Sequence, residues 1–186
     1  MHTNQHESEI TRHTSHVTRH ASRHRFLTMP QELTTQLVTR NELELFLNDQ
    51  GLRPSMGGLL ADRQYALPLR GWIMGVFTPF WKDLCRQLDI HKYAPERNDC
   101  DKSSRLAAAW AAICHARTPG APVAGLAFGE FWYVKDNPVA AHALCVAVTR
   151  NDSGGLALLF FEAIPVVAGL VELTPTEIVS CTAYRI

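Results

Sequence analysis

The hydrophobic pattern of the chain changes its period near residue 117, and this change constrains the fold most. Before it, apolar residues recur at helical spacing, most clearly in the segment that starts at Cys100, "CDKSSRLAAAWAAICHA". After it come strand-like runs, "VAGLAFGEFWYV", "AAHALCVAVTR" and "GLALLFFEAIPVV". Because helices precede strands, we expect the α+β class, with a helical N-terminal part packed on an antiparallel sheet.

Local signals refine this expectation at three places. Thr78 and Pro79 are typical of the start of a helix, as N-cap and first helical residue. Thr174, Pro175 and Glu177 form a capping-box pattern that predicts one short helix. The turn residues 152–155 lie between the last two strand-like runs and predict an antiparallel hairpin.

The length and composition predict one domain with an appended tail. The chain has 186 residues, of which 46% are hydrophobic, enough for one substantial core. Residues 29–186 are expected to form this domain, and residues 1–28, rich in His, Thr and Arg, a disordered tail. Four tail histidines, at positions 13, 16, 20 and 24, would share one helix face and could hold nickel or zinc adventitiously. A solvated polar tail is the favoured interpretation, since a metal site needs a folded frame.

Charge, apolar stretches and cysteine content limit the partners and the compartment that we expect for the protein. Lysine plus arginine equal aspartate plus glutamate, at 18 each, so we expect no nucleic-acid binding. The longest apolar stretch, residues 155–173, contains Glu162 and Pro165, which argues against a membrane span. The N-terminus lacks the apolar core of a secretory signal. Five widely spaced cysteines favour reduced thiols, and hence a cytoplasmic protein.

Cys100 is the first candidate for chemistry. A thiol at a helix N-terminus faces unpaired backbone N–H groups and the positive end of the helix dipole, which favour the thiolate. The flanking Asp99 and Asp101 oppose a thiolate if they lie close to it. The alternative is structural, with Asp99 as helix cap and Cys100 as a small buried residue.

His142 and Glu162 are the other candidates, because each interrupts an apolar strand-like run. An ionised carboxylate inside "LALLFFEAIPVV" would cost several kcal/mol unless it is paired. On neighbouring antiparallel strands the imidazole and the carboxylate can meet. Cys100, His142 and Glu162 would then be the nucleophile, the base and the orienting group of a thiol-dependent acyl transfer. Taken singly, each also has a structural explanation in the core.

The order Cys, His, Glu and the segments "ERNDCD", "HAL.VAV" and "LLFFEAIP" resemble the papain-like cysteine peptidase domain of certain fungal chimeric lectins and related small phage-encoded proteins. The resemblance covers roughly residues 78–180. It implies a papain-like fold, catalytic roles for Cys100, His142 and Glu162, a calcium requirement and a homodimer. The glutamine that papain-like enzymes carry before the cysteine is missing here, and Asn98 is the substitute we consider as oxyanion donor.

Two functions therefore remain open from the sequence. The first is a thiol-dependent hydrolase that cleaves an amide bond in a protein or peptide substrate. The second is a catalytically inactive papain-like scaffold that binds or inhibits a protein partner. The residues indicate no dedicated metal site, and calcium enters through the resemblance alone.

Overall fold

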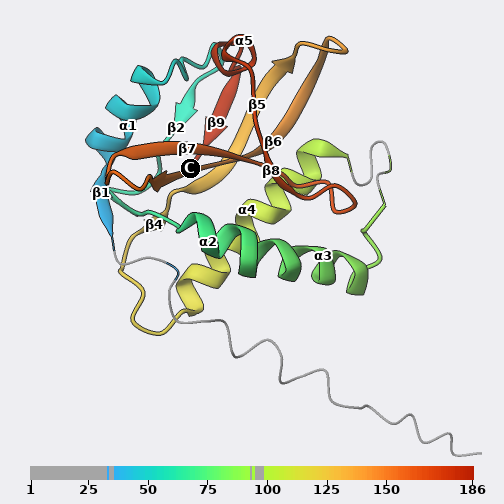
Figure 1. Cartoon of the computed structure of the whole chain (residues 1–186), viewed down its shortest axis with the longest axis horizontal. Helices are drawn as coiled ribbons and strands as arrows, with labels where there is room; N and C mark the ends of the chain where they lie inside the picture. Colours follow the sequence, from blue (N-terminus) through green and yellow to red (C-terminus); the bar gives the residue numbers. More distant parts are fainter. Residues whose placement is uncertain (1–32, 34–35, 93, 95–98) are drawn as a thin grey trace, which may run out of the picture.

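The computed structural model describes residues 33, 36–92, 94 and 99–186. Short strands and a helix come first along these residues, then a run of helices and a run of strands, and a last short helix and strand (Figure 1). The helices, including the π-helical segment η2, are α1 (Arg40–Asp49), α2 (Arg70–Trp72), η2 (Ile73–Phe77), α3 (Thr78–Gln87), α4 (Cys100–Arg117) and α5 (Pro175–Val179). The strands are β1 (Leu37–Thr39), β2 (Gly58–Leu59), β3 (Gln64–Ala66), β4 (Gly125–Leu126), β5 (Phe128–Lys135), β6 (Ala140–Arg150), β7 (Leu156–Glu162), β8 (Gly169–Val171) and β9 (Ala183–Arg185).

Two mixed sheets organise these elements. The larger has the order β2-β9-β5-β6-β7-β8, and the smaller the order β1-β3-β4. Most neighbours are antiparallel, but β2 pairs with β9, and β3 with β4, in parallel. The predicted hairpin is confirmed: β6 and β7 pair from Cys145↔Phe161 to Arg150↔Leu156. Its turn places Gly154 at φ 83°, a conformation that favours glycine.

The predicted fold class is wrong. We expected a helical N-terminal part packed on an antiparallel sheet, but strands run through both halves of the described chain, and both sheets contain a parallel pair. The described residues form nine strands in two mixed sheets, so the architecture is centred on sheets. The physical reason is strand length: β1, β2 and β3 have two or three residues each, too few to show a period of two in the sequence.

The larger sheet is covered on both faces. Along β6 the side chains alternate, so that Cys145 and Ala147 join one buried cluster while Leu144 and Val146 join the other. The first cluster contains side chains of α2, η2, α3 and α4, and the second contains side chains of α1, β1 and β3. This arrangement fits the predicted single domain of residues 29–186, which stays a prediction, as does the 1–28 tail outside the described residues.

An aromatic cluster fixes the helices against β7. Phe77 of η2 lies 5.3 Å from Phe128 and 5.6 Å from Phe161, measured between ring centroids. Trp81 of α3 is fully buried and donates a hydrogen bond from Nε1 to the Ala163 carbonyl, at 2.8 Å. Phe161 and Ala163 are the two neighbours of Glu162 in the sequence, so these contacts fix the backbone on both sides of Glu162. None of the helices described combines the length and apolar character that a membrane crossing needs.

Candidate functional site

Cys100 is the first residue of α4, as the sequence predicts. Asp99 occupies the N-cap position in an extended conformation, but its side chain makes no cap hydrogen bond. The start of the helix places the thiol at the positive end of the helix dipole, which favours negative charge. The Cys100 side chain is partly exposed, unlike the other four cysteines, which are buried. A ligand from solvent can thus reach this sulfur.

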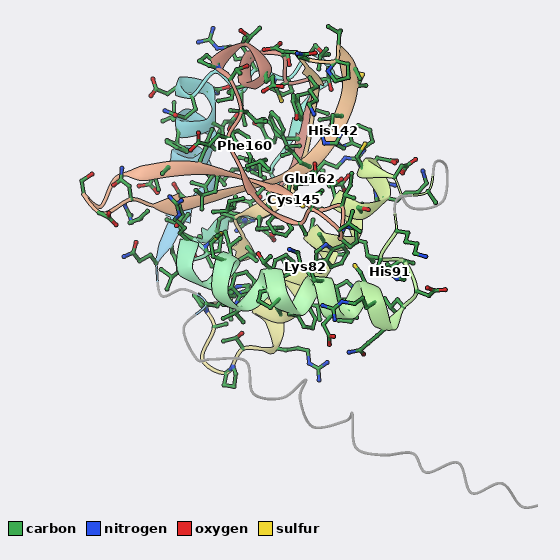
Figure 2. The ribbon with its side chains drawn as sticks, turned by 45° about the vertical axis from the view of Figure 1, so that its right-hand side comes forward. Lys82, His91, His142, Cys145, Phe160 and Glu162 are labelled. Carbon is green, nitrogen blue, oxygen red and sulfur yellow. The ribbon has the colours of Figure 1, made fainter. Side chains whose placement is uncertain are left out.

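His142 and Glu162 meet across neighbouring strands (Figure 2). His142 lies near the start of β6 and Glu162 at the end of β7, and Nε2 of the imidazole is 2.9 Å from Oε2 of the carboxylate. Extending the pairing Cys145↔Phe161 by one step sets Glu162 opposite Leu144, diagonal to His142 on the same face. The other oxygen, Oε1, accepts a hydrogen bond from the Ile164 N–H at 3.0 Å. The buried carboxylate is therefore paired on both sides.

The thiol of Cys100 completes the group through a hydrogen bond with the His142 imidazole. Since Nε2 lies against Glu162, Nδ1 is the ring nitrogen left for the sulfur. This hydrogen bond lowers the pKa of Cys100, and the Ala143 backbone N–H lowers it further, while burial opposes both. The pKa of His142 rises to about 9, because Cys100 and then Glu162 stabilise the charged ring. These directions favour a thiolate beside an imidazolium over the neutral pair.

The carboxylates that flank Cys100 are neutralised by a lysine. Lys102 Nζ lies 3.0 and 3.1 Å from the two carboxylate oxygens of Asp99 and 3.3 Å from Oδ1 of Asp101. The negative charge of Asp101 still raises the pKa of Cys100, but it is the smallest of the five influences on this thiol. The sequence-based concern that two aspartates would suppress the thiolate is thereby reduced.

Tyr133 packs against the imidazole. It pairs with His142 across β5 and β6, and the two rings meet edge to face, with centroids 5.7 Å apart and planes at 75°. The tyrosine is buried at 3% exposure, and burial followed by nearby negative charges raises its pKa to about 12. A neutral, immobile ring therefore limits the rotation of His142.

The other thiols lack such an environment. Burial raises the pKa of Cys85 and of Cys181 to about 12, and that of Cys114 to about 11. Burial also raises the pKa of Cys145, whose Sγ donates to the Ser104 carbonyl. Cys100 is the cysteine with a lowered pKa, so its reactivity can be distinguished from theirs.

Two sequence-based expectations are not tested by the described residues, and a third is the calcium requirement. Asn98, considered as oxyanion donor, lies outside the described residues, as do the tail histidines. Calcium requires several oxygen ligands, and the described residues contain no group of three or more His, Cys, Asp or Glu side chains arranged to hold a metal ion. No step can therefore be assigned to calcium.

Comparisons with known proteins concern the fold. No protein-family model and no curated protein matches the chain. Solved lectin structures do match. One, described as a complex of PSL1a with E64, has a TM-score of 0.60 and 19% identity, over 84% of this chain and 51% of that one. Another, Polyporus squamosus lectin bound to the human-type influenza-binding epitope Neu5Aca2-6Galb1-4GlcNAc, has a TM-score of 0.59 and 19% identity, over 84% and 50%. The chain spans about half the length of these structures.

These matches correct the predicted family and function. We expected a papain-like peptidase domain with phage-encoded relatives, but the matching structures are those of a fungal lectin and no family model supports the peptidase assignment. The prediction of a thiol-dependent hydrolase is corrected on the same finding, because the matching structures are those of a lectin. The expectations of a thiol protease and of a phage-related protein are corrected by the same finding. The contacts among Cys100, His142 and Glu162 are a separate observation.

Three features of the site escaped the sequence analysis. Lys102, Tyr133 and the Ala143 N–H all contact or influence the thiol and imidazole. The spacing of Asp99 and Lys102, one helical turn apart, is a signal that could have predicted their ion pair. The placement of Tyr133 depends on the β5–β6 register, which no local pattern reveals.

Proposed function

We propose that the chain is a ligand-binding module whose site is built around a nucleophilic thiol. In this proposal Cys100 is the nucleophile, His142 its proton partner and Glu162 the residue that orients His142. The observation that carries the proposal is the continuous chain of contacts from the thiol to the imidazole and, at 2.9 Å, on to the carboxylate. A thiolate paired with an imidazolium is the form in which a cysteine forms bonds to carbon.

The ligand class follows from this chemistry: a molecule with an electrophilic carbon, for which an epoxide is the simplest case. The lone pair of the Cys100 thiolate forms a sulfur–carbon bond as one carbon–oxygen bond of the epoxide breaks. The released oxygen keeps the electron pair of that bond and takes the proton of the His142 imidazolium. The product is a thioether with a hydroxyl group, and no further reactant is needed.

One of the matched structures supports the choice of probe. It is described as a complex with E64, a compound that carries an epoxide. At 19% identity the match transfers no activity, so the reaction at Cys100 has to be tested on this chain. A peptide-like probe also addresses the predicted protein or peptide partner, which stays a prediction.

The test is to incubate the full chain with E64 and measure the intact mass, followed by peptide mapping. We expect one adduct, on Cys100, and none in Cys100→Ser. Cys114→Ser is the matched control, because Cys114 lies on the same helix and its pKa is raised to about 11. An unmodified wild-type protein, or adducts spread over several cysteines, would contradict the proposal.

A second candidate, carbohydrate binding, is favoured by the other matched structure, which is described as bound to a sialylated epitope. A hollow of about 660 Å³ on this chain lies along β7 and β8 and offers polar groups from Gln50, Arg70 and Glu172 beside apolar ones. Calorimetry with the epitope Neu5Aca2-6Galb1-4GlcNAc tests it: we expect binding that Arg70→Ala weakens and Lys82→Ala leaves unchanged. Absence of binding up to about 1 mM would contradict this candidate and leave the thiol proposal intact.

A reactive thiol also bears on the compartment. Cys100 has to stay reduced to react, and all five cysteines are free thiols in the structure. We therefore propose that the protein acts in a reducing compartment such as the cytoplasm. The homodimer implied by the sequence resemblance stays a prediction.

A further inference from the structure

Lys102 holds the two carboxylates that lie next to the thiol in sequence. Its ammonium group contacts both oxygens of Asp99, at 3.0 and 3.1 Å, and Oδ1 of Asp101, at 3.3 Å. The two aspartates are largely shielded from solvent, with side-chain exposures of 17% and 26%, whereas the lysine is 40% exposed. One cation thus compensates part of a double negative charge beside Cys100.

We propose that Lys102 is a positioning residue for the thiol site, which keeps Asp99 and Asp101 paired and thereby limits the repulsion between these carboxylates and a Cys100 thiolate. This inference rests on the proposed function, because it concerns the same thiolate. The lysine touches no ligand in this proposal and acts through the two carboxylates. Its role is electrostatic and geometric together, since the ion pairs also fix where the carboxylates point.

The physical reason is the balance of charge at the start of α4. Without Lys102, the charge of Asp101, which already opposes ionisation of the Cys100 thiol, would be uncompensated, and like charges disfavour ionisation. At partly screened positions each such charge shifts the pKa of a neighbour by about half a unit to one unit. The hydrogen bonds that Lys102 Nζ donates to Asp99 would be lost at the same time.

Other titratable groups around the thiol also influence the ionisation of Cys100. His142 on β6 is the main one, and Glu162 on β7 acts through it. Tyr133 on β5 is neutral at pH values below its pKa, which is raised to about 12. Since none of these groups is removed in a Lys102 variant, a change in the ionisation of Cys100 can be assigned to the aspartates.

The experiment measures the rate of E64 alkylation of Cys100 against pH in the full chain. For Lys102→Gln we expect the midpoint of the profile to move up by about half a unit to one unit, with the plateau at high pH unchanged. Below the midpoint the rate then falls about 3- to 10-fold. Lys102→Arg should retain the wild-type midpoint, and so should Lys82→Gln, which removes a lysine from α3 instead.

A compensating variant separates electrostatics from misfolding. Asp101→Asn combined with Lys102→Gln removes one charge of each sign, including the carboxylate that acts on the thiol, and should bring the midpoint back toward the wild-type value. A Lys102→Gln profile that coincides with the wild type, or whose plateau falls at an unchanged midpoint, would overturn the inference. If Lys102→Gln fails to fold, a failure of the double variant to restore the wild-type midpoint would overturn it. If Cys100 of the wild type is not alkylated at all, the proposed function fails first, so the two failures are distinguishable.

Discussion

The imidazole of His142 and the carboxylate of Glu162 lie 2.9 Å apart although 20 residues separate them along the chain. The β6–β7 hairpin creates this contact, because its register sets the two residues on one face of the sheet. Both side chains are mostly buried, at 18% and 12% exposure, so solvent screens their interaction weakly. A buried carboxylate with two partners is thus available to hold a charged imidazole next to Cys100.

Replacing His142 by glutamine removes the group that most lowers the pKa of Cys100. We expect the rate of iodoacetamide labelling of Cys100 near pH 7 to fall, because a higher pKa of the thiol leaves a smaller fraction of thiolate. Mass spectrometry of the labelled peptides measures it. His91→Gln is the control, since His91 contacts Asp89 and not the thiol. Equal labelling of the wild type and His142→Gln would contradict the role of the imidazole.

Replacing Glu162 by glutamine removes a charge while an oxygen remains for the Ile164 N–H. The pKa of His142, raised to about 9, should fall toward its ordinary value of 6.5, as NMR titration of the ring can show. A raised histidine pKa stabilises the fold fully below 6.5 and loses this effect as the pH rises through about 9. The stability advantage of the wild type over Glu162→Gln should therefore shrink across this window, and a constant difference would argue against the ion pair.

Gly129 allows β9 to approach β5. A Cβ atom built there would lie 1.8 Å from the Arg185 carbonyl oxygen, a backbone atom that cannot move aside without breaking the β5–β9 pairing. Gly129→Ala should lower the free energy of unfolding by about 3 kcal/mol in urea denaturation. Gly71→Ala is the matched control, because nothing lies within 4 Å of its added Cβ. It should leave stability unchanged or raise it by up to about 1 kcal/mol.

Phe77 packs between the helices and the strand that ends at Glu162. It is fully buried and contacts the rings of Phe128 and Phe161. Phe77→Ala should reduce the free energy of unfolding by about 3–5 kcal/mol, through lost burial and the cavity left behind. Leu45→Ala, at a residue that is 70% exposed, should change it by less than about 0.5 kcal/mol. Similar losses in both variants would contradict this assignment of the core.

Local signals in the sequence predicted local structure well. The capping box at Thr174 and Glu177 is present, and the turn before Gly155 closes the hairpin. At Thr78 the predicted N-cap is wrong: the helix continues from η2, and Thr78 Oγ1 donates to the Ile73 carbonyl one turn earlier instead of capping a new helix. The fold class was missed because the parallel pairing of β2 with β9 joins residues far apart in sequence, which no local pattern encodes.

At the candidate site, too, some residues could be predicted from the sequence and others could not. Cys100, His142 and Glu162 stood out because each breaks an apolar or helical pattern, and such breaks are visible in one sequence. Lys102 and Tyr133 did not stand out, since a surface lysine and a strand tyrosine are ordinary where they occur. Their contacts with Asp99 and His142 depend on side-chain directions that only the folded chain defines.

The central claim, a thiolate paired with an imidazolium at Cys100, is tested most directly by the ultraviolet absorbance of the thiolate. The difference between the wild type and Cys100→Ser, followed against pH, isolates the ionisation of this one sulfur. Because the His142 hydrogen bond lowers the pKa of Cys100, we predict a midpoint clearly below the ordinary value of 9.0. A midpoint at or above 9.0 would contradict the account.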